Sequence, residues 1–173
     1  MKISVLFGHW SLSFRKSLDF DGLWQDPRGL TGSELGCIRI AECLSSLGHD
    51  VTLRTVSAQV GKEYGGLKVR SIDEPIDPCD VVISINEPDL LRAAPAGAFR
   101  ACAFWLNDVS FCKSGFDEYV DLFCSPSAGH LEQMMTNPRW RHAEVTAEHP
   151  QGKSQYTPDP AKWCVVPLGG DPE

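Results

Sequence analysis

The chain has 173 residues, 42% hydrophobic and 23% charged, a composition typical of one globular domain with a sizeable core. Its formal net charge of −7 argues against nucleic acid as the main partner, because phosphate backbones require a basic surface. No apolar run approaches the roughly 20 residues that span a bilayer, and no secretory signal is recognised. We therefore expect a cytoplasmic protein.

The predicted elements begin with a strand over residues 2–7 and a long loop over residues 8–31. A helix starts at Gly32, because Thr31 and Glu34 have the spacing of a capping box. Gly48 ends this helix, and a second strand follows over residues 51–56, which completes a βαβ unit. Apolar residues at helical spacing predict the core face of the helix: Leu35, Ile38, Ala41, Leu44 and Leu47.

Five further strands are predicted over residues 67–69, 81–85, 101–106, 121–124 and 163–167. The β-branched run at 81–85 is typical of a strand buried on both faces of a parallel sheet. A helix over residues 125–135 is expected to have Ser125 as its cap. Strands that alternate with helices predict an α/β fold: a doubly wound, Rossmann-like parallel sheet with helices on both faces.

The seven cysteines are scattered and odd in number, with no C-x-x-C pair. Since most lie in apolar stretches, we interpret them as reduced core residues rather than as zinc ligands or disulfides. No metal site is predicted.

Ligands of open α/β sheets bind at the carboxyl ends of the strands, and several polar residues follow predicted strand ends. The first helical turn, at Gly32 and Ser33, offers backbone N–H groups and the positive end of the helix dipole to a phosphate. The alternative is a plain helix cap, and no Walker or G-x-G-x-x-G pattern accompanies it.

Asn107 and Asp108 follow the strand at 101–106, and they form either a ligand site or a turn. Glu87 follows the strand at 81–85, where it meets a ligand or caps a helix. His9 and Trp10 follow the first strand, as sugar contacts or as loop packing. His130, inside the last predicted helix, is interpreted as structural.

The loop over residues 8–31 is long for a strand-to-helix connection and carries aromatic residues among Arg15, Lys16 and Arg28. It is an acceptor lid, a contact with lipid headgroups or a flexible loop. A peripheral membrane contact therefore stays open.

Four stretches in order resemble the N-terminal domain of a GT-B-fold glycosyltransferase of the retaining family four. They are Thr31-Gly32-Ser33-Glu34 through Leu47-Gly48-His49-Asp50-Val51, then Cys79-Asp80-Val81-Val82-Ile83-Ser84, then Trp105-Leu106-Asn107-Asp108, and lastly Val120 through Ser127 with Val165-Val166-Pro167-Leu168-Gly169-Gly170-Asp171.

The resemblance implies transfer of a sugar from a nucleotide-sugar donor to a hydroxyl, with retention and without a metal or other cofactor. It implies catalytic roles for Asn107 and Asp108, donor-phosphate contacts at Gly32 and Ser33, and a sugar or lipid-linked acceptor at His9, Trp10 and Glu87. Residues 1–167 then form the acceptor-side domain. Residues 168–173 begin a linker to a donor-binding domain that acts in cis or in trans.

Three positions depart from the family pattern: Thr31 replaces a glycine, Asn107 replaces a histidine, and Leu168 replaces the asparagine of an Asn-Gly pair in the linker. An asparagine can hydrogen-bond a sugar hydroxyl but cannot titrate. A non-catalytic truncated binding module, or a half-enzyme that needs a separate donor domain, is the alternative. A lone flavodoxin-like nucleotide binder is a third interpretation.

Overall fold

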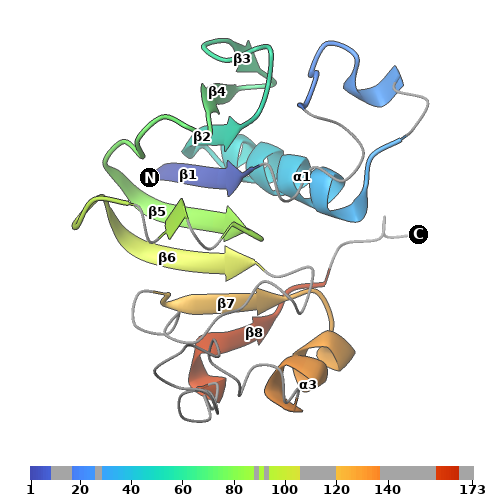
Figure 1. Cartoon of the computed structure of the whole chain (residues 1–173), viewed down its shortest axis with the longest axis vertical. Helices are drawn as coiled ribbons and strands as arrows, with labels where there is room; N and C mark the ends of the chain where they lie inside the picture. The colour runs from blue at the N-terminus through green and yellow to red at the C-terminus, as the bar shows by residue number, and fades with distance from the viewer. Residues whose placement is uncertain are drawn as a thin grey trace, which may run out of the picture.

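The computed structural model describes residues 1–8, 17–25, 29–87, 90–91, 94–105, 120–136 and 159–167. In this part of the chain, eight strands form one sheet, drawn as stacked arrows in Figure 1. The strands are β1 (Lys2–Phe7), β2 (Asp50–Thr55), β3 (Glu63–Tyr64), β4 (Leu67–Ser71), β5 (Cys79–Ile85), β6 (Phe99–Trp105), β7 (Leu122–Ser125) and β8 (Trp163–Val165).

The strand order is β3-β4-β2-β1-β5-β6-β7-β8, and every neighbouring pair is parallel except β3 and β4. Without the short strand β3, the order from β4 onward reads 3-2-1-4-5-6-7, which contains the Rossmann order 3-2-1-4-5-6. The predicted α/β class with a mostly parallel sheet is therefore confirmed. The β3–β4 hairpin was not predicted; Gly65 and Gly66 form its turn with φ of 55° and 83°, values that glycine adopts without strain.

Two α-helices are described, α1 (Gly32–Ser46) and α3 (Ala128–Thr136), together with short 3-10 turns η1 (Leu23–Gln25) and η5 (Pro160–Lys162). They contact different apolar clusters. Alternate residues of β1, such as Val5 and Phe7, pack with Ile38 of α1, whereas Leu6 belongs to the cluster that contains Met134 of α3. Since successive side chains of a strand point to opposite faces, the two clusters lie on opposite faces of the sheet.

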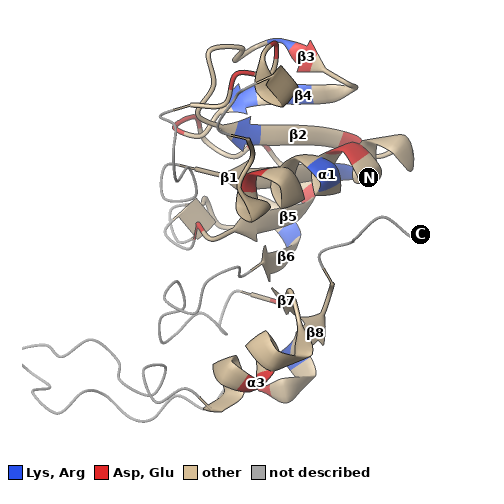
Figure 2. Ribbon diagram, turned by 90° about the vertical axis from the view of Figure 1, so that its right-hand side faces the viewer, with Lys and Arg blue, Asp and Glu red and all other residues tan. Residues whose placement is uncertain are grey.

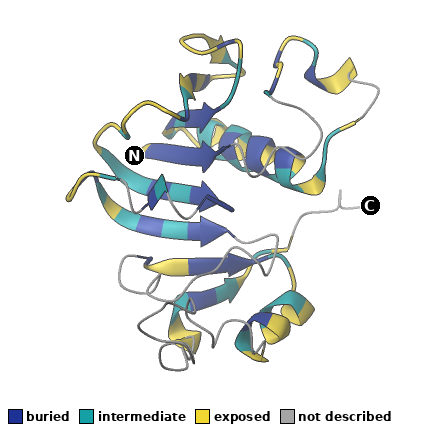
Figure 3. Ribbon diagram, viewed as in Figure 1, coloured by how far each residue is buried: buried dark blue, intermediate teal, exposed yellow. Residues whose placement is uncertain are grey.

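The central strands are the most deeply buried part of the molecule, and exposure increases toward the β3–β4 hairpin, as Figure 3 shows. Val5, Phe7 and Leu53 are fully buried. Burial of each large apolar side chain stabilises the fold by roughly 1.5–3 kcal/mol. No helix in the described ranges combines the length and apolar character that a membrane crossing needs.

The core face of α1 differs from the prediction at both of its ends. Cys37, Ile38 and Ala41 are buried, but Leu35 is 39% exposed and Leu47 is 68% exposed. The buried stripe runs through Glu34, Cys37, Ile38 and Ala41 at helical spacing, so the buried residue of the first turn is Glu34 and not Leu35. The helix-stop prediction is confirmed, since Gly48 has φ of 83°.

The cap of α3 is also corrected. Ser127, not Ser125, caps the helix, because the Ser127 hydroxyl accepts a hydrogen bond from the His130 backbone N–H at 3.1 Å. Ser125 is instead the last residue of β7 and is fully buried.

Residues 17–25 of the long first loop pack on the core. Leu18, Phe20 and Leu23 are buried, and the Phe20 ring lies 4.9 Å from the Tyr64 ring between centroids. Gln59 fixes the segment further by accepting from the Phe20 N–H at 3.2 Å. Residues 17–25 are therefore held against the core, whereas residues 9–16 and 26–28 of the loop, Trp10 among them, lie outside the described ranges.

Candidate functional site

The carboxyl ends of β1 and β5 lie at the topological switch point of the sheet, where the order of successive strands reverses. From β1 the chain proceeds to β2 on one side, and it later returns to β5 on the other side. In open α/β sheets such a switch point leaves a crevice in which ligands bind. The residues that leave these two strands are Gly8 and Asn86-Glu87, so the candidate site is built around them.

Glu87 joins the two strand ends. Its Oε1 accepts a hydrogen bond from the Gly8 backbone N–H at 3.0 Å, and the residue is only 4% exposed. A Cβ atom on Gly8 would lie 2.9 Å from the Glu87 carboxyl carbon, so the close approach requires glycine at this position. Glu87 thus follows the end of β5, as expected, and its contact with the end of β1 is a new finding; contact with an acceptor stays a prediction.

The backbone around Glu87 is tightly held. The Ser84 hydroxyl donates to the Glu87 carbonyl at 2.8 Å, and the Asn86 N–H donates to the Trp105 carbonyl at 3.1 Å. Asn86 has φ of 55°, a left-handed conformation that is uncommon outside glycine and that asparagine tolerates better than most residues. These bonds connect the ends of β5 and β6 and orient the Glu87 carboxylate.

The first turn of α1 lies on the side toward which the arrowheads of β1 and β5 point in Figure 1. The predicted capping box is present: Thr31 Oγ1 accepts from the Glu34 N–H at 3.3 Å, and Glu34 Oε2 accepts from the Thr31 N–H at 2.8 Å. Gly32 is exposed, and a Cβ there would meet nothing within 4 Å.

The capping box also bears on phosphate binding at this turn. Glu34 is fully buried, and its carboxylate occupies the positive end of the helix dipole. A phosphate near Gly32 and Ser33 would therefore meet a negative charge already in place. Their role as donor-phosphate contacts stays a prediction.

Four other predicted site residues, His9, Trp10, Asn107 and Asp108, lie outside the described residues. The structure places their neighbours in sequence. Gly8 ends the segment that contains β1, and Trp105 is the last residue of β6. The last described residues before these four, Gly8 and Trp105, therefore both lie at the edge of the sheet that carries Glu87.

A serine–histidine pair that the sequence analysis did not predict lies at the end of β7. Ser125 Oγ and His130 Nδ1 are 2.6 Å apart, within hydrogen-bond distance. Such a pair can activate a nucleophile, but the Ser125 side chain is fully buried and cannot meet a substrate. The pair instead joins β7 to α3, which agrees with the structural role predicted for His130.

Among the residues with described positions, no group of three or more His, Cys, Asp or Glu side chains is arranged to hold a metal ion. The six cysteines in that part of the chain are free thiols, of which Cys37, Cys102 and Cys124 are buried.

Comparisons with protein-family models, with curated protein sequences and with solved structures give no significant match.

Proposed function

We propose that this chain is the acceptor-side domain of a retaining glycosyltransferase of the GT-B class, with a doubly wound sheet. The observation that carries the proposal is the buried Glu87 carboxylate, which the Gly8 N–H holds at the switch point of a Rossmann-ordered sheet. The ordered motifs of the sequence supply the reaction class. The packing of α1 and α3 on opposite faces supports the doubly wound arrangement.

In this proposal Glu87 positions the acceptor. A carboxylate has about four acceptor sites, so it can accept from a sugar hydroxyl as well as from the Gly8 N–H. Asn107 and Asp108 orient the reacting hydroxyl and stabilise developing charge, and His9 and Trp10 contact the sugar ring. Fixing the acceptor in this way lowers the entropic part of the barrier without a protein nucleophile.

The donor requires a second wall. Glu34 already places a carboxylate at the start of α1, so Gly32 and Ser33 alone do not balance the charge of a diphosphate. We infer that a nucleotide-sugar donor is held mainly by a further domain, in cis or in trans. The activity then belongs to the pair of domains.

A donor-turnover assay tests this division of labour. The chain of residues 1–173 is incubated with nucleotide-sugars and saccharides, and release of free nucleotide is measured. We expect no turnover above the buffer control. Turnover by this chain alone would contradict a half-site.

The non-catalytic binding module remains the second candidate. The specific observation that favours it is the Glu34 carboxylate, which weakens the only helix start predicted to contact phosphate. Calorimetry with free nucleotides distinguishes the transferase domain and the binding module from a flavodoxin-like binder. The flavodoxin-like binder would bind a nucleotide at micromolar concentration by itself.

A further inference from the structure

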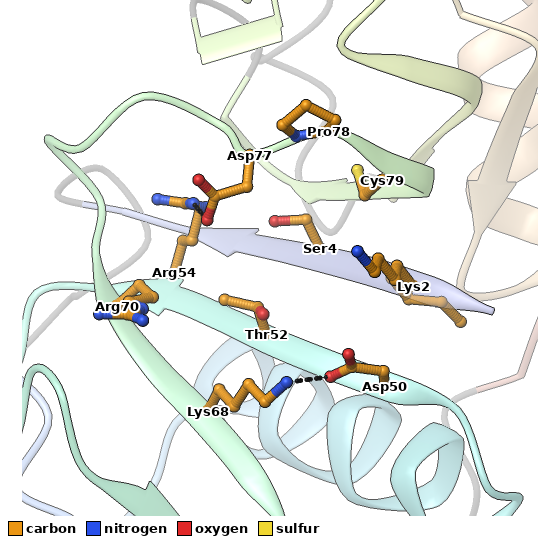
Figure 4. A pocket seen from close by; sticks show the side chains of 11 residues that line it. Lys2, Ser4, Asp50, Thr52, Arg54, Lys68, Arg70, Asp77, Pro78 and Cys79 are labelled. Atoms are coloured by element: carbon orange, nitrogen blue, oxygen red, sulfur yellow. Dashed lines mark hydrogen bonds and ion pairs between the residues drawn. The ribbon is translucent and has the colours of Figure 1, made fainter.

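The sheet face opposite α1 carries a polar cavity of about 230 Å³ over β1, β2 and β4. Figure 4 shows the strands in front of α1, with the lining side chains on the near side. In the described ranges, the segment that contains β3 joins β2 to β4 and a loop joins β4 to β5, so neither connection contributes a helix to this face. The cavity is distinct from the carboxyl edge that contains Gly8 and Glu87.

The parallel register explains why polar side chains gather on this face. Lys2 pairs with Asp50, Thr52 with Lys68, and Arg54 with Arg70 across neighbouring strands. Because side chains alternate along a strand, residues two positions apart share one face. Figure 2 shows Lys and Arg positions along β2 and β4.

The cavity is electropositive although the chain is acidic. Four of its lining residues are cationic, namely Lys2, Arg54, Lys68 and Arg70, and two are acidic, namely Asp50 and Asp77. Both carboxylates already have cationic partners. Lys68 Nζ lies 2.7 Å from Asp50 Oδ1, and Arg54 Nη2 lies 2.8 Å from Asp77 Oδ2.

The remaining cations have no such partner. Within the described residues, the side chains of Lys2 and Arg70 form no ion pair. They therefore leave an excess of positive charge over the sheet.

Arg54 gives the second, independent observation. Its side chain is 2% exposed, whereas the side chain of its ion-pair partner Asp77 is 79% exposed. The charge of the buried guanidinium is therefore balanced by a carboxylate that lies mostly in solvent. Its Nε is buried with no hydrogen-bond partner in the described structure, and the same holds for the Ser4 hydroxyl beside it in the cavity lining. Buried donors without partners are costly, and a ligand that accepts hydrogen bonds would remove that cost.

We propose that this cavity is a binding site for a small phosphate-type oxyanion. Arg70 and Lys2 supply charge, and Arg54 Nε and the Ser4 hydroxyl supply buried hydrogen bonds. The volume is below the range of about 300–1,000 Å³ that encloses drug-sized ligands, which favours a phosphate group over a whole nucleotide. This site does not depend on the proposed transferase activity.

The test is a titration of the ¹⁵N-labelled full chain with inorganic phosphate at constant ionic strength, chloride being the balancing anion. We expect saturable amide shifts confined to Lys2–Ser4, Thr52–Arg54 and Lys68–Arg70. Loss of a charge-assisted contact should raise the dissociation constant about tenfold or more in Arg70→Gln.

Two further variants separate the site from general screening. Ser4→Ala should also weaken binding, whereas Lys62→Gln, at an exposed lysine outside the cavity, should leave it unchanged. Equal shifts in Arg70→Gln and the unmodified chain, or shifts spread over the whole surface, would overturn the proposal.

A second arm identifies the source of the phosphate group. Tighter binding of glucose 1-phosphate than of inorganic phosphate would identify a phosphate ester as the ligand, and the reverse order would identify free phosphate. Glucose itself should not shift these amides; the same shifts with glucose would contradict an anion site.

Discussion

Gly8 and Glu87 are the residues that hold the carboxyl ends of β1 and β5 together. The bond between them is buried and joins positions 79 apart in the sequence. Loss of the Glu87 acceptor would remove this bond from the buried Gly8 N–H, at a cost of about 1–3 kcal/mol.

Gly8→Ala tests the close approach directly. The added Cβ would lie 2.9 Å from the Glu87 carboxyl group, so we expect the free energy of unfolding to fall by about 1–3 kcal/mol. Gly32→Ala is the matched control, because its Cβ meets nothing within 4 Å and a helical Gly→Ala change stabilises by up to about 1 kcal/mol. Urea unfolding of both variants measures the difference, and equal behaviour would contradict the proposed steric requirement at position 8.

The buried thiols predict a loss of stability in alkali. Burial, with smaller contributions from the nearby Asp121 carboxylate and the Cys79 thiol, raises the pKa of Cys102 from 9.0 to about 12. An unfolded thiol ionises near pH 9, so between about pH 9 and pH 12 the unfolded chain binds fewer protons than the folded one. The free energy of unfolding therefore falls as pH rises through this range, by up to about 1.4 kcal/mol per pH unit for each such thiol.

Urea unfolding at several pH values measures that slope. Cys102→Ala removes one buried thiol, so its slope above pH 9 should be shallower than that of the unmodified chain. Identical slopes would show that Cys102 does not contribute.

At the scale of elements, the start of α1 depends on Thr31. Thr31→Ala removes the hydroxyl that accepts from the Glu34 N–H, and we expect a loss of about 1 kcal/mol in the free energy of unfolding. Thr31→Ser keeps the hydroxyl, so its free energy of unfolding should fall by only about a few tenths of a kcal/mol. Thermal unfolding followed by circular dichroism compares the two, and an equal loss would assign the effect to the methyl group instead.

The sequence predicted most elements because their signals are local. The capping box of α1, the stop at Gly48 and the apolar strands all follow from residues near one another in the chain. The exposure of Leu35 could not be predicted in this way, since it depends on the burial of Glu34 in the folded protein. Strand β3 has only two residues and carries no periodic pattern, so the hairpin could not be predicted.

The candidate site was predictable in part for the same reason. Glu87 was found because it directly follows a strand, but its bond to Gly8 spans the sheet and needs the strand order. The cavity over β1, β2 and β4 was not predicted, since it depends on the register of three strands and on the hairpin. The alternation of Lys68 and Arg70 was the one signal that could have indicated it.

At the scale of the whole molecule, the sheet has two proposed functional regions. The carboxyl edge with Glu87 would receive the acceptor, and the open face with Arg54 would bind a phosphate group. The two regions lie on different parts of the sheet, so variants of one should leave the other unchanged. Arg70→Gln is therefore expected to preserve acceptor binding while it weakens phosphate binding.

The most direct test of the acceptor-side role is an amide-shift titration of the ¹⁵N-labelled chain with neutral mono- and disaccharides at high millimolar concentration. We predict saturable shifts at Gly8, Asn86, Glu87 and Trp105, weakened in Glu87→Gln, with no tight binding of nucleotide-sugars. Glu87→Gln keeps an oxygen that can accept from the Gly8 N–H, so a separate unfolding measurement should show that it remains folded. Shifts that avoid this edge, no localised shift with any saccharide, or micromolar nucleotide binding by the chain alone would contradict the account.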